Sequence, residues 1–175
     1  MSPQDPFCWK RAAAAAFLGA AAAQAMADGP HHSEATLTVT GGPHAGQHTL
    51  RVDDVGCEVV RRPGKPRYFN ANFGSQGVKD PGKLSFVLIR IPNADGPGSP
   101  PPSGFEATIN FGPFMNKGAT VYMSGTDKNN PSRKGGTGSV LLTEDGKQAR
   151  VTLDLQPQPG IGIKGTVTCT VIAAG

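Results

Sequence analysis

The order of apolar and polar residues along most of the chain is typical of β-strands. Apolar and polar residues alternate over 105–111 and 148–155, which predicts half-buried strands, because successive side chains of a strand point to opposite faces. Segment 83–91 has apolar residues at odd and at even positions, which predicts a central strand covered on both faces. Less regular patterns predict further strands at 35–40, 48–52, 57–60, 118–124 and 139–143.

Segment 165–172 is predicted to form the last strand. Val167, Cys169 and Val171 share one face and threonines occupy the other, so Cys169 is expected to point into the core. The dipeptide Asp145-Gly146 is typical of a tight hairpin. No window after residue 27 shows helical spacing. The pattern therefore predicts an all-β domain, an antiparallel sandwich or a flattened barrel.

The first 27 residues have a different pattern, that of a secretory signal peptide. Lys10 and Arg11 precede an uncharged, alanine-rich run, and the run ends in AQAMA, where Ala25 and Ala27 suit a leader peptidase. The apolar run is about twelve residues long, whereas a membrane span needs about 20. The alternative, an alanine-rich surface helix, would carry charges along one face. We therefore expect cleavage after Ala27 and no transmembrane segment.

This cleavage would place the mature protein in the periplasm or outside the cell. Residues 28–34 are expected to form a flexible N-terminus, and residues 35–175 a single β domain. The chain holds 17 basic and 13 acidic residues, a net charge of +4. Without the three charged residues of the signal peptide (Asp5, Lys10 and Arg11), 15 basic and 12 acidic residues leave +3. This mild excess does not indicate specific binding of nucleic acid.

Cleavage also removes Cys8, which leaves Cys57 and Cys169 as the cysteines of the mature chain. A structural zinc site needs four ligands, and the sequence contains no C-x-x-C pair. Two cysteines in an exported chain are more simply interpreted as one disulfide. We therefore predict a Cys57–Cys169 bond that ties the last strand to an early one, worth about 4 to 5 kcal/mol in the chain-entropy model.

The loop at 61–77 is the main candidate for partner binding. Its four cations directly precede two aromatic residues; the six are Arg61, Arg62, Lys65, Arg67, Tyr68 and Phe69. Two prolines are expected to keep the segment extended, so that it presents a dense positive charge to an anionic partner, with stacking or interfacial burial of the aromatics. The alternative is a solvated hairpin tip whose cations discourage strand pairing, while the aromatics begin the next strand.

Four histidines near the mature N-terminus suggest a second function, the binding of copper or zinc in the periplasm. They are His31, His32, His44 and His48. On a strand, residues four apart are about 13 Å from each other, so convergence on one metal would require the chain to fold back.

Sequence motifs of enzymes give a weaker signal than the cationic loop or the histidines. The sequence has no G-x-S-x-G elbow, no H-E-x-x-H helix and no Walker loop, so we predict no catalytic residues and no cofactor. A hydrolase whose catalytic residues are dispersed along the chain is a further alternative.

One cysteine lies in an early strand, VGCEVV, and the other in the last strand, GTVTCTVI. In a signal-bearing β domain this pattern resembles the mycobacterial 19-kilodalton antigen type of lipoprotein, although the lipidated cysteine of that family is absent here. The resemblance implies an extracytoplasmic sandwich and carries over no catalytic residues. We therefore expect an exported, non-catalytic envelope or secreted domain that recognises an anionic surface, a glycan or a protein through its loops.

Overall fold

A computed structural model describes residues 31–94, 104–114, 116–125 and 135–174, which form ten β-strands. The described residues include no helix that is long and apolar enough to cross a membrane. The predicted signal peptide lies outside them. The strands are β1 (His32–Thr40), β2 (Gly46–Asp53), β3 (Cys57–Val60), β4 (Tyr68–Gly74), β5 (Leu84–Ile91), β6 (Glu106–Phe111), β7 (Thr120–Gly125), β8 (Thr137–Glu144), β9 (Gln148–Gln158) and β10 (Ile161–Ala174).

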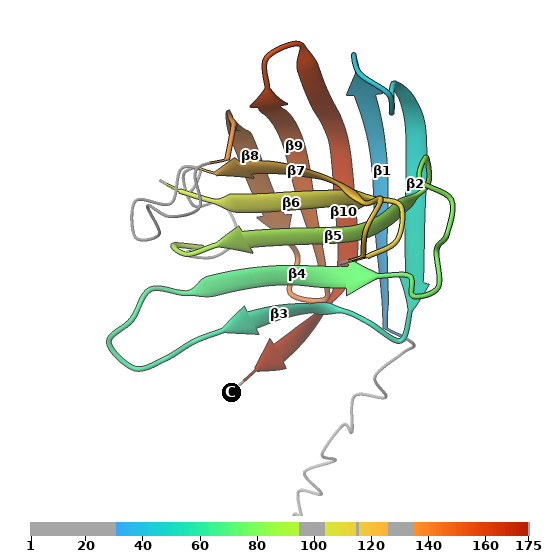
Figure 1. Cartoon of the computed structure of the whole chain (residues 1–175). Helices are drawn as coiled ribbons and strands as arrows, with labels where there is room; N and C mark the ends of the chain where they lie inside the picture. Colours follow the sequence, from blue (N-terminus) through green and yellow to red (C-terminus); the bar gives the residue numbers. More distant parts are fainter. Residues whose placement is uncertain (1–30, 95–103, 115, 126–134, 175) are drawn as a thin grey trace, which may run out of the picture.

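The strands form one hydrogen-bonded sheet that folds over into two layers, which cross at a steep angle (Figure 1). The β10 layer has the order β2-β1-β10-β9-β8, and the β5 layer has the order β3-β4-β5-β6-β7. β10 belongs to both layers, because its first part pairs with β1 and β9 while Val171–Ala174 pair with β3. The predicted all-β sandwich is confirmed.

One pairing departs from a purely antiparallel arrangement. β3 and β10 pair in parallel, with Val171 opposite Cys57, whereas the other pairs of named strands are antiparallel. β10 is 14 residues long, so it extends beyond its own layer and reaches the edge of the other one. The expectation of a purely antiparallel sandwich is therefore wrong at this edge.

The predicted disulfide joins Cys57 to Cys169 beside this parallel pair. Their Cα atoms are 5.7 Å apart, within the range that a disulfide bridges, and the two residues are 112 positions apart in sequence. Both are buried, and Cys169 faces the core as its alternation with Val167 predicted. The bond therefore fastens β10 where it passes from one layer to the other.

The core lies between the layers and is made of the inward-facing apolar residues of both. The largest fully buried side chains are Phe69, Phe111, Leu37, Leu84, Ile89, Ile91, Ile109, Leu153, Leu155, Ile163, Val39 and Val87. β5 is buried on both of its faces except at Phe86 and Arg90, as the largely apolar segment 83–91 predicted.

The structure corrects two segment boundaries. β4 lies within 61–77, which was predicted to be a loop; there Phe69, Ala71 and Phe73 point into the core and alternate with more exposed residues. Tyr68 and Phe69 therefore begin a strand, which was the alternative interpretation of these two aromatic residues. β1 begins at His32, because its first residues pair with β2, so residues 32–34 do not belong to a flexible N-terminus.

The predicted tight turn connects β8 to β9. Gly146 has a φ of +89°, in the left-handed region that glycine adopts without steric cost. The Asp145 carboxylate accepts hydrogen bonds from the backbone N–H groups of Gln148 (2.7 Å) and Lys147 (2.9 Å). Both bonds favour the charged carboxylate and so lower the pKa of Asp145, and the bond from Gln148 has the larger effect.

Candidate binding sites

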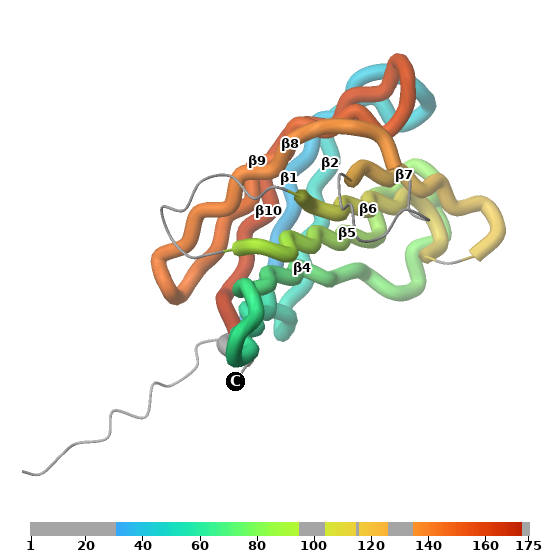
Figure 2. Tube along the Cα trace, turned by 90° about the vertical axis from the view of Figure 1, so that its left-hand side faces the viewer, coloured from blue at the N-terminus to red at the C-terminus, as the bar shows by residue number. Residues whose placement is uncertain are grey.

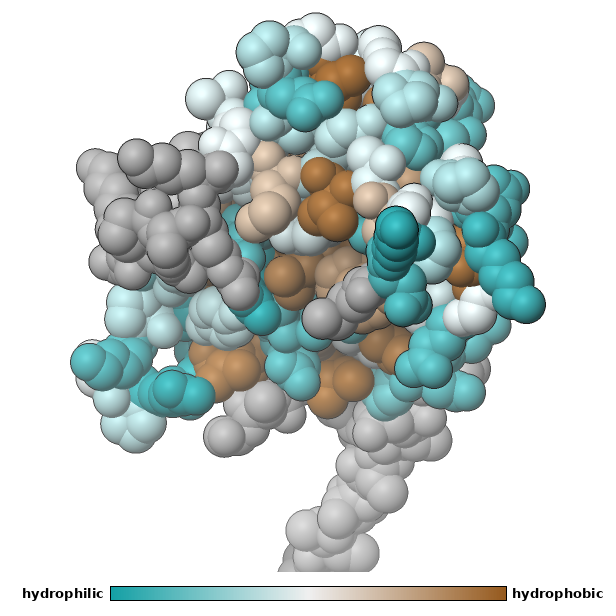
Figure 3. All heavy atoms as spheres, viewed as in Figure 1, coloured by the Kyte–Doolittle hydropathy of each residue, from teal (hydrophilic) through white to brown (hydrophobic). Residues whose placement is uncertain are grey.

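Three of the predicted cations lie at the tip of the β3–β4 hairpin, which we define as residues 61–66. The Lys65 N–H donates to the Arg62 carbonyl (3.0 Å), and Gly64 has a φ of +69°, so the segment turns at Pro63-Gly64 instead of running extended. Arg61, Arg62 and Lys65 are exposed. The hairpin projects beyond the neighbouring strands (Figure 1), and its end is strongly hydrophilic (Figure 3).

The fourth cation, Arg67, has a different environment. Its side chain is 9% exposed and forms an ion pair with Glu144, whose side chain is 3% exposed. The Arg67 carbonyl also accepts a hydrogen bond from the Ala94 N–H (2.7 Å). The prediction that Arg67 belongs to an exposed cationic surface is therefore wrong, because its charge is neutralised inside the fold.

This ion pair connects the two layers, since Arg67 directly precedes β4 and Glu144 ends β8. Within the described residues, the Nε and Nη1 atoms of Arg67 and the Oε1 atom of Glu144 are buried and have no hydrogen-bond partner. A buried charge is costly without its counterion, so each residue requires the other. The pair therefore holds the base of the hairpin against the β8–β9 turn.

The two aromatic residues are also part of the fold. Phe69 is fully buried in β4, where it lies opposite Val59 of β3 and Ile91 of β5. Its predicted role in stacking or interfacial burial is wrong, because it is a core residue. Tyr68 is half-buried, opposite Val60 at the start of the hairpin's ladder.

The four histidines fall into two groups that lie apart along β1. His32 begins β1 opposite Asp53, and His31 precedes it, whereas His44 follows the end of β1. His48 lies on β2 opposite Leu37, five positions along β1 from His32, which is about 16 Å at 3.3 Å per residue, so His31 and His32 are far from His44 and His48. Within the described residues, no three of the ligand types His, Cys, Asp and Glu come together as a metal site. A single site that uses all four histidines is therefore wrong.

His44 instead has a structural environment. Its ring is buried, stacks on Phe111 at 4.3 Å between centroids, and makes two hydrogen bonds. Nε2 donates to the Pro81 carbonyl (3.1 Å), and Nδ1 accepts from the Tyr122 hydroxyl (2.9 Å). Burial raises the pKa of Tyr122, so this hydroxyl keeps its proton at neutral pH. His48 donates to the His44 carbonyl (2.8 Å), so both side chains support the turn between β1 and β2.

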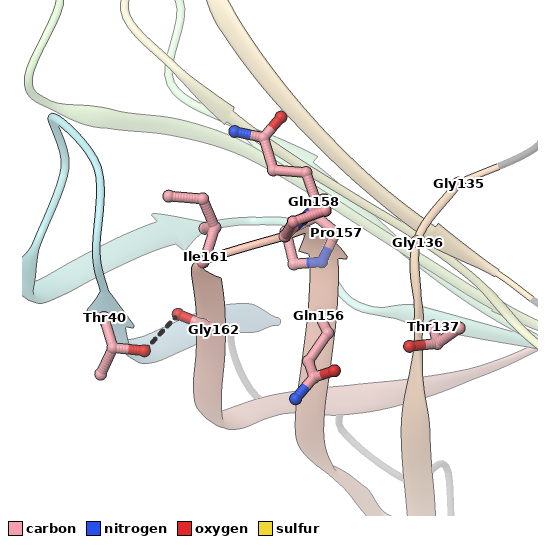
Figure 4. Close-up of a pocket in the computed structure, with 11 residues that line it drawn as sticks. Thr40, Gly135, Gly136, Thr137, Gln156, Pro157, Gln158, Ile161 and Gly162 are labelled. Carbon is pink, nitrogen blue, oxygen red and sulfur yellow. Dashed lines mark hydrogen bonds between the residues drawn. The ribbon is translucent and has the colours of Figure 1, made fainter.

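A second candidate site is an open groove of about 650 Å³ where β1 and β9 end and β8 and β10 begin (Figure 4). Thr40, Gly162, Gln156 and Thr137 follow one another across these four strands. The Gln156 side chain lies on β9, between β10 and β8. The Gln158 side chain points in the opposite direction, away from Gln156. We call this feature the β9–β10 groove.

The groove results from an irregularity in the pairing of β9 with β10. Ile161 lies opposite Gln158 and Ile163 opposite Leu155, so two residues of β9 oppose the single residue Gly162. This is a β-bulge, a feature that redirects side chains and interrupts the ladder. The predicted strand pattern did not include this bulge. The signal was available in Gln156-Pro157, because proline has no N–H to donate to a ladder and is tolerated at bulges.

Comparisons of the chain with protein-family models, with curated proteins and with solved structures find no match.

Proposed function

We propose that this protein is an exported, non-catalytic binding domain that recognises an anionic component of the cell envelope through the tip of its β3–β4 hairpin. The observation that carries the proposal is the exposure of Arg61, Arg62 and Lys65 together at a projecting tip. The tip has a rigid base. Arg67 pairs with Glu144 on one side of it, and the Cys57–Cys169 bond anchors the start of β3 on the other.

The sequence and the disulfide support export. Lys10-Arg11, the alanine-rich run and the A-x-A site have the order of a secretory signal peptide. Disulfides persist in the periplasm and outside the cell and are rare in reducing compartments. The resemblance to the mycobacterial 19-kilodalton antigen type of lipoprotein is consistent with the same location. We therefore propose that the mature domain begins at Asp28 and acts in the periplasm or outside the cell.

The three cations predict weak binding that depends on salt. A cation near an anionic membrane surface is worth about 1 kcal/mol, so three contribute about 3 kcal/mol. Screening at physiological salt reduces interactions beyond about 8 Å. One domain should therefore bind weakly and reversibly.

The test is co-sedimentation of the mature protein with vesicles of phosphatidylglycerol and phosphatidylcholine at low and at high salt. We expect binding at low salt that high salt abolishes. The variant Arg61→Gln/Arg62→Gln/Lys65→Gln should lose most of the binding and keep the stability of the wild type, because the three side chains are exposed.

A matched control removes three charges from other exposed positions. The variant Lys79→Gln/Lys83→Gln/Lys117→Gln has the same net charge as the hairpin variant, but its substitutions lie in the turns before β5 and β7. It should sediment with vesicles nearly as well as the wild type. Equal loss in the two variants would show that net charge, and not the hairpin tip, determines binding, which would contradict the proposal.

A further inference from the structure

We propose that the β9–β10 groove is a binding site for a neutral oligosaccharide, separate from the cationic hairpin. The groove and the hairpin tip lie at opposite ends of the molecule in both views (Figures 1 and 2). A ligand at one end therefore leaves the other end accessible, and the two sites can be tested independently.

The chemistry of the groove favours an uncharged ligand with many hydrogen-bonding groups. All eleven lining residues are uncharged. The Gln156 amide donates and accepts, as does the Thr137 hydroxyl, and the Thr40 hydroxyl, which donates to the Gly162 carbonyl, can still accept. Among these lining residues of the described chain, a charged ligand would find no counterion to replace its hydration. Sugar hydroxyls also donate and accept, so they match this lining.

Apolar surface in the groove suits the C–H faces of a sugar ring. Pro157, Pro159 and Ile161 lie among the amides and hydroxyls. Gly162 leaves the space between Thr40 and the bulge open, since a Cβ at this position would lie 2.6 Å from the Thr40 hydroxyl oxygen. Instead, that hydroxyl donates to the Gly162 carbonyl (3.3 Å) and is held at the margin of the groove.

The strand pairing argues against an extended peptide as the ligand. A peptide binds a sheet by adding a strand to an open edge. β1, β10 and β9 pair with neighbours on both sides, and at the start of β8 the residue Gly136 is already bridged to Ser124. Recognition must therefore come mainly from side chains, which favours a saccharide.

The test uses the ¹⁵N-labelled mature protein and four probes at millimolar concentration: maltohexaose, cellohexaose, chitohexaose and mannohexaose. We expect at least one of them to shift the backbone amide signals of Thr40, Gln156 and Gly162 in a saturable way. The variant Gln156→Ala should weaken that binding roughly two- to tenfold, the change that corresponds to one net hydrogen bond.

Two controls make the result specific. Thr152→Ala alters an exposed residue on the same side of β9 outside the groove, so it should leave the affinity unchanged. The hairpin variant Arg61→Gln/Arg62→Gln/Lys65→Gln should also bind the saccharide like the wild type. If no probe shifts these signals, the proposal is wrong. It is equally wrong if an uncharged glycine-serine peptide shifts them and none of the saccharides does.

Discussion

The end of the molecule that carries the β3–β4 hairpin and the end that carries the β9–β10 turn are closed by different interactions (Figure 2). At the hairpin end, a disulfide and a buried ion pair join the two layers. At the turn end, the backbone itself comes close: a Cβ on Gly41 would overlap the carbonyl oxygen of Gly160. A buried hydrogen bond between His44 and Tyr122 joins the same end to β7.

The difference shows what each end can present to a partner. The disulfide and the ion pair fix the base of the hairpin, so its tip can carry exposed cations without contributing to the core. At the turn end, glycines remove side chains from the sheet surface, which creates a groove lined by amides, hydroxyls and prolines. The first arrangement presents charge, and the second presents shape and hydrogen-bonding groups.

Removal of the disulfide should have the largest effect on stability. Replacing both Cys57 and Cys169 by alanine should lower the free energy of unfolding by about 2 to 5 kcal/mol, because the bond restricts the unfolded chain by linking residues 112 positions apart. Urea denaturation followed by circular dichroism measures the change. Reduced wild-type protein is the control and should be destabilised similarly. An unchanged midpoint in both would show that the hairpin end does not depend on the bond.

The buried ion pair should come next. Arg67→Ala leaves Glu144 buried without its counterion and should cost about 3 to 4 kcal/mol. The double variant Arg67→Met/Glu144→Leu removes both charges and should recover most of the loss, because apolar residues of similar size avoid the cost of burying charge. The same urea experiment compares the three proteins. A double variant no more stable than Arg67→Ala would contradict this account.

Close backbone contact at the turn end predicts a smaller loss. A Cβ on Gly136 would overlap the backbone of Gln156 and Pro157, so Gly136→Ala should cost about 2 kcal/mol through overpacking. Gly82→Ala is the matched control, since the atom nearest to its Cβ would be a side-chain oxygen of Asp80 at 3.4 Å. That change should stay within about 0.5 kcal/mol. Similar thermal midpoints for the two variants would contradict the claim that close backbone contact at Gly136 excludes a side chain.

The smallest expected effect is on the loss of stability at low pH. The folded pKa of Asp145 lies below its ordinary value of 3.8, so this carboxylate stabilises the fold above that value and stops doing so as the pH falls through the lower, folded pKa. An asparagine side chain at this position would not titrate. Asp145→Asn should therefore lose less stability than the wild type when the pH is lowered below about 4. Urea midpoints measured on both sides of pH 4 test this, and parallel losses would contradict it.

Much of the fold follows from local patterns. The pattern of apolar residues identified nine of the ten strand regions, eight from alternation or less regular patterns and β5 from an apolar run, because a strand with one buried face repeats every two residues and a central strand is buried on both faces. The tenth, β4, was missed because the cations before it suggested a loop, although Phe69, Ala71 and Phe73 alternate correctly. The disulfide was predicted because the expected processing leaves only two cysteines, and Cys169 alternates with core residues.

The candidate sites depended on contacts between distant parts of the chain. Arg67 looks like the other cations in the sequence, and only its pairing with Glu144, 77 positions away, separates it from them. The histidines looked like one group until β1 separated His31 and His32 from His44 and His48. The groove required four strand ends to meet at a bulge. Strand periodicity is a property of neighbouring residues, so the sequence by itself determined it; charge neutralisation and concavity depend on which segments meet, so only the tertiary structure decided them.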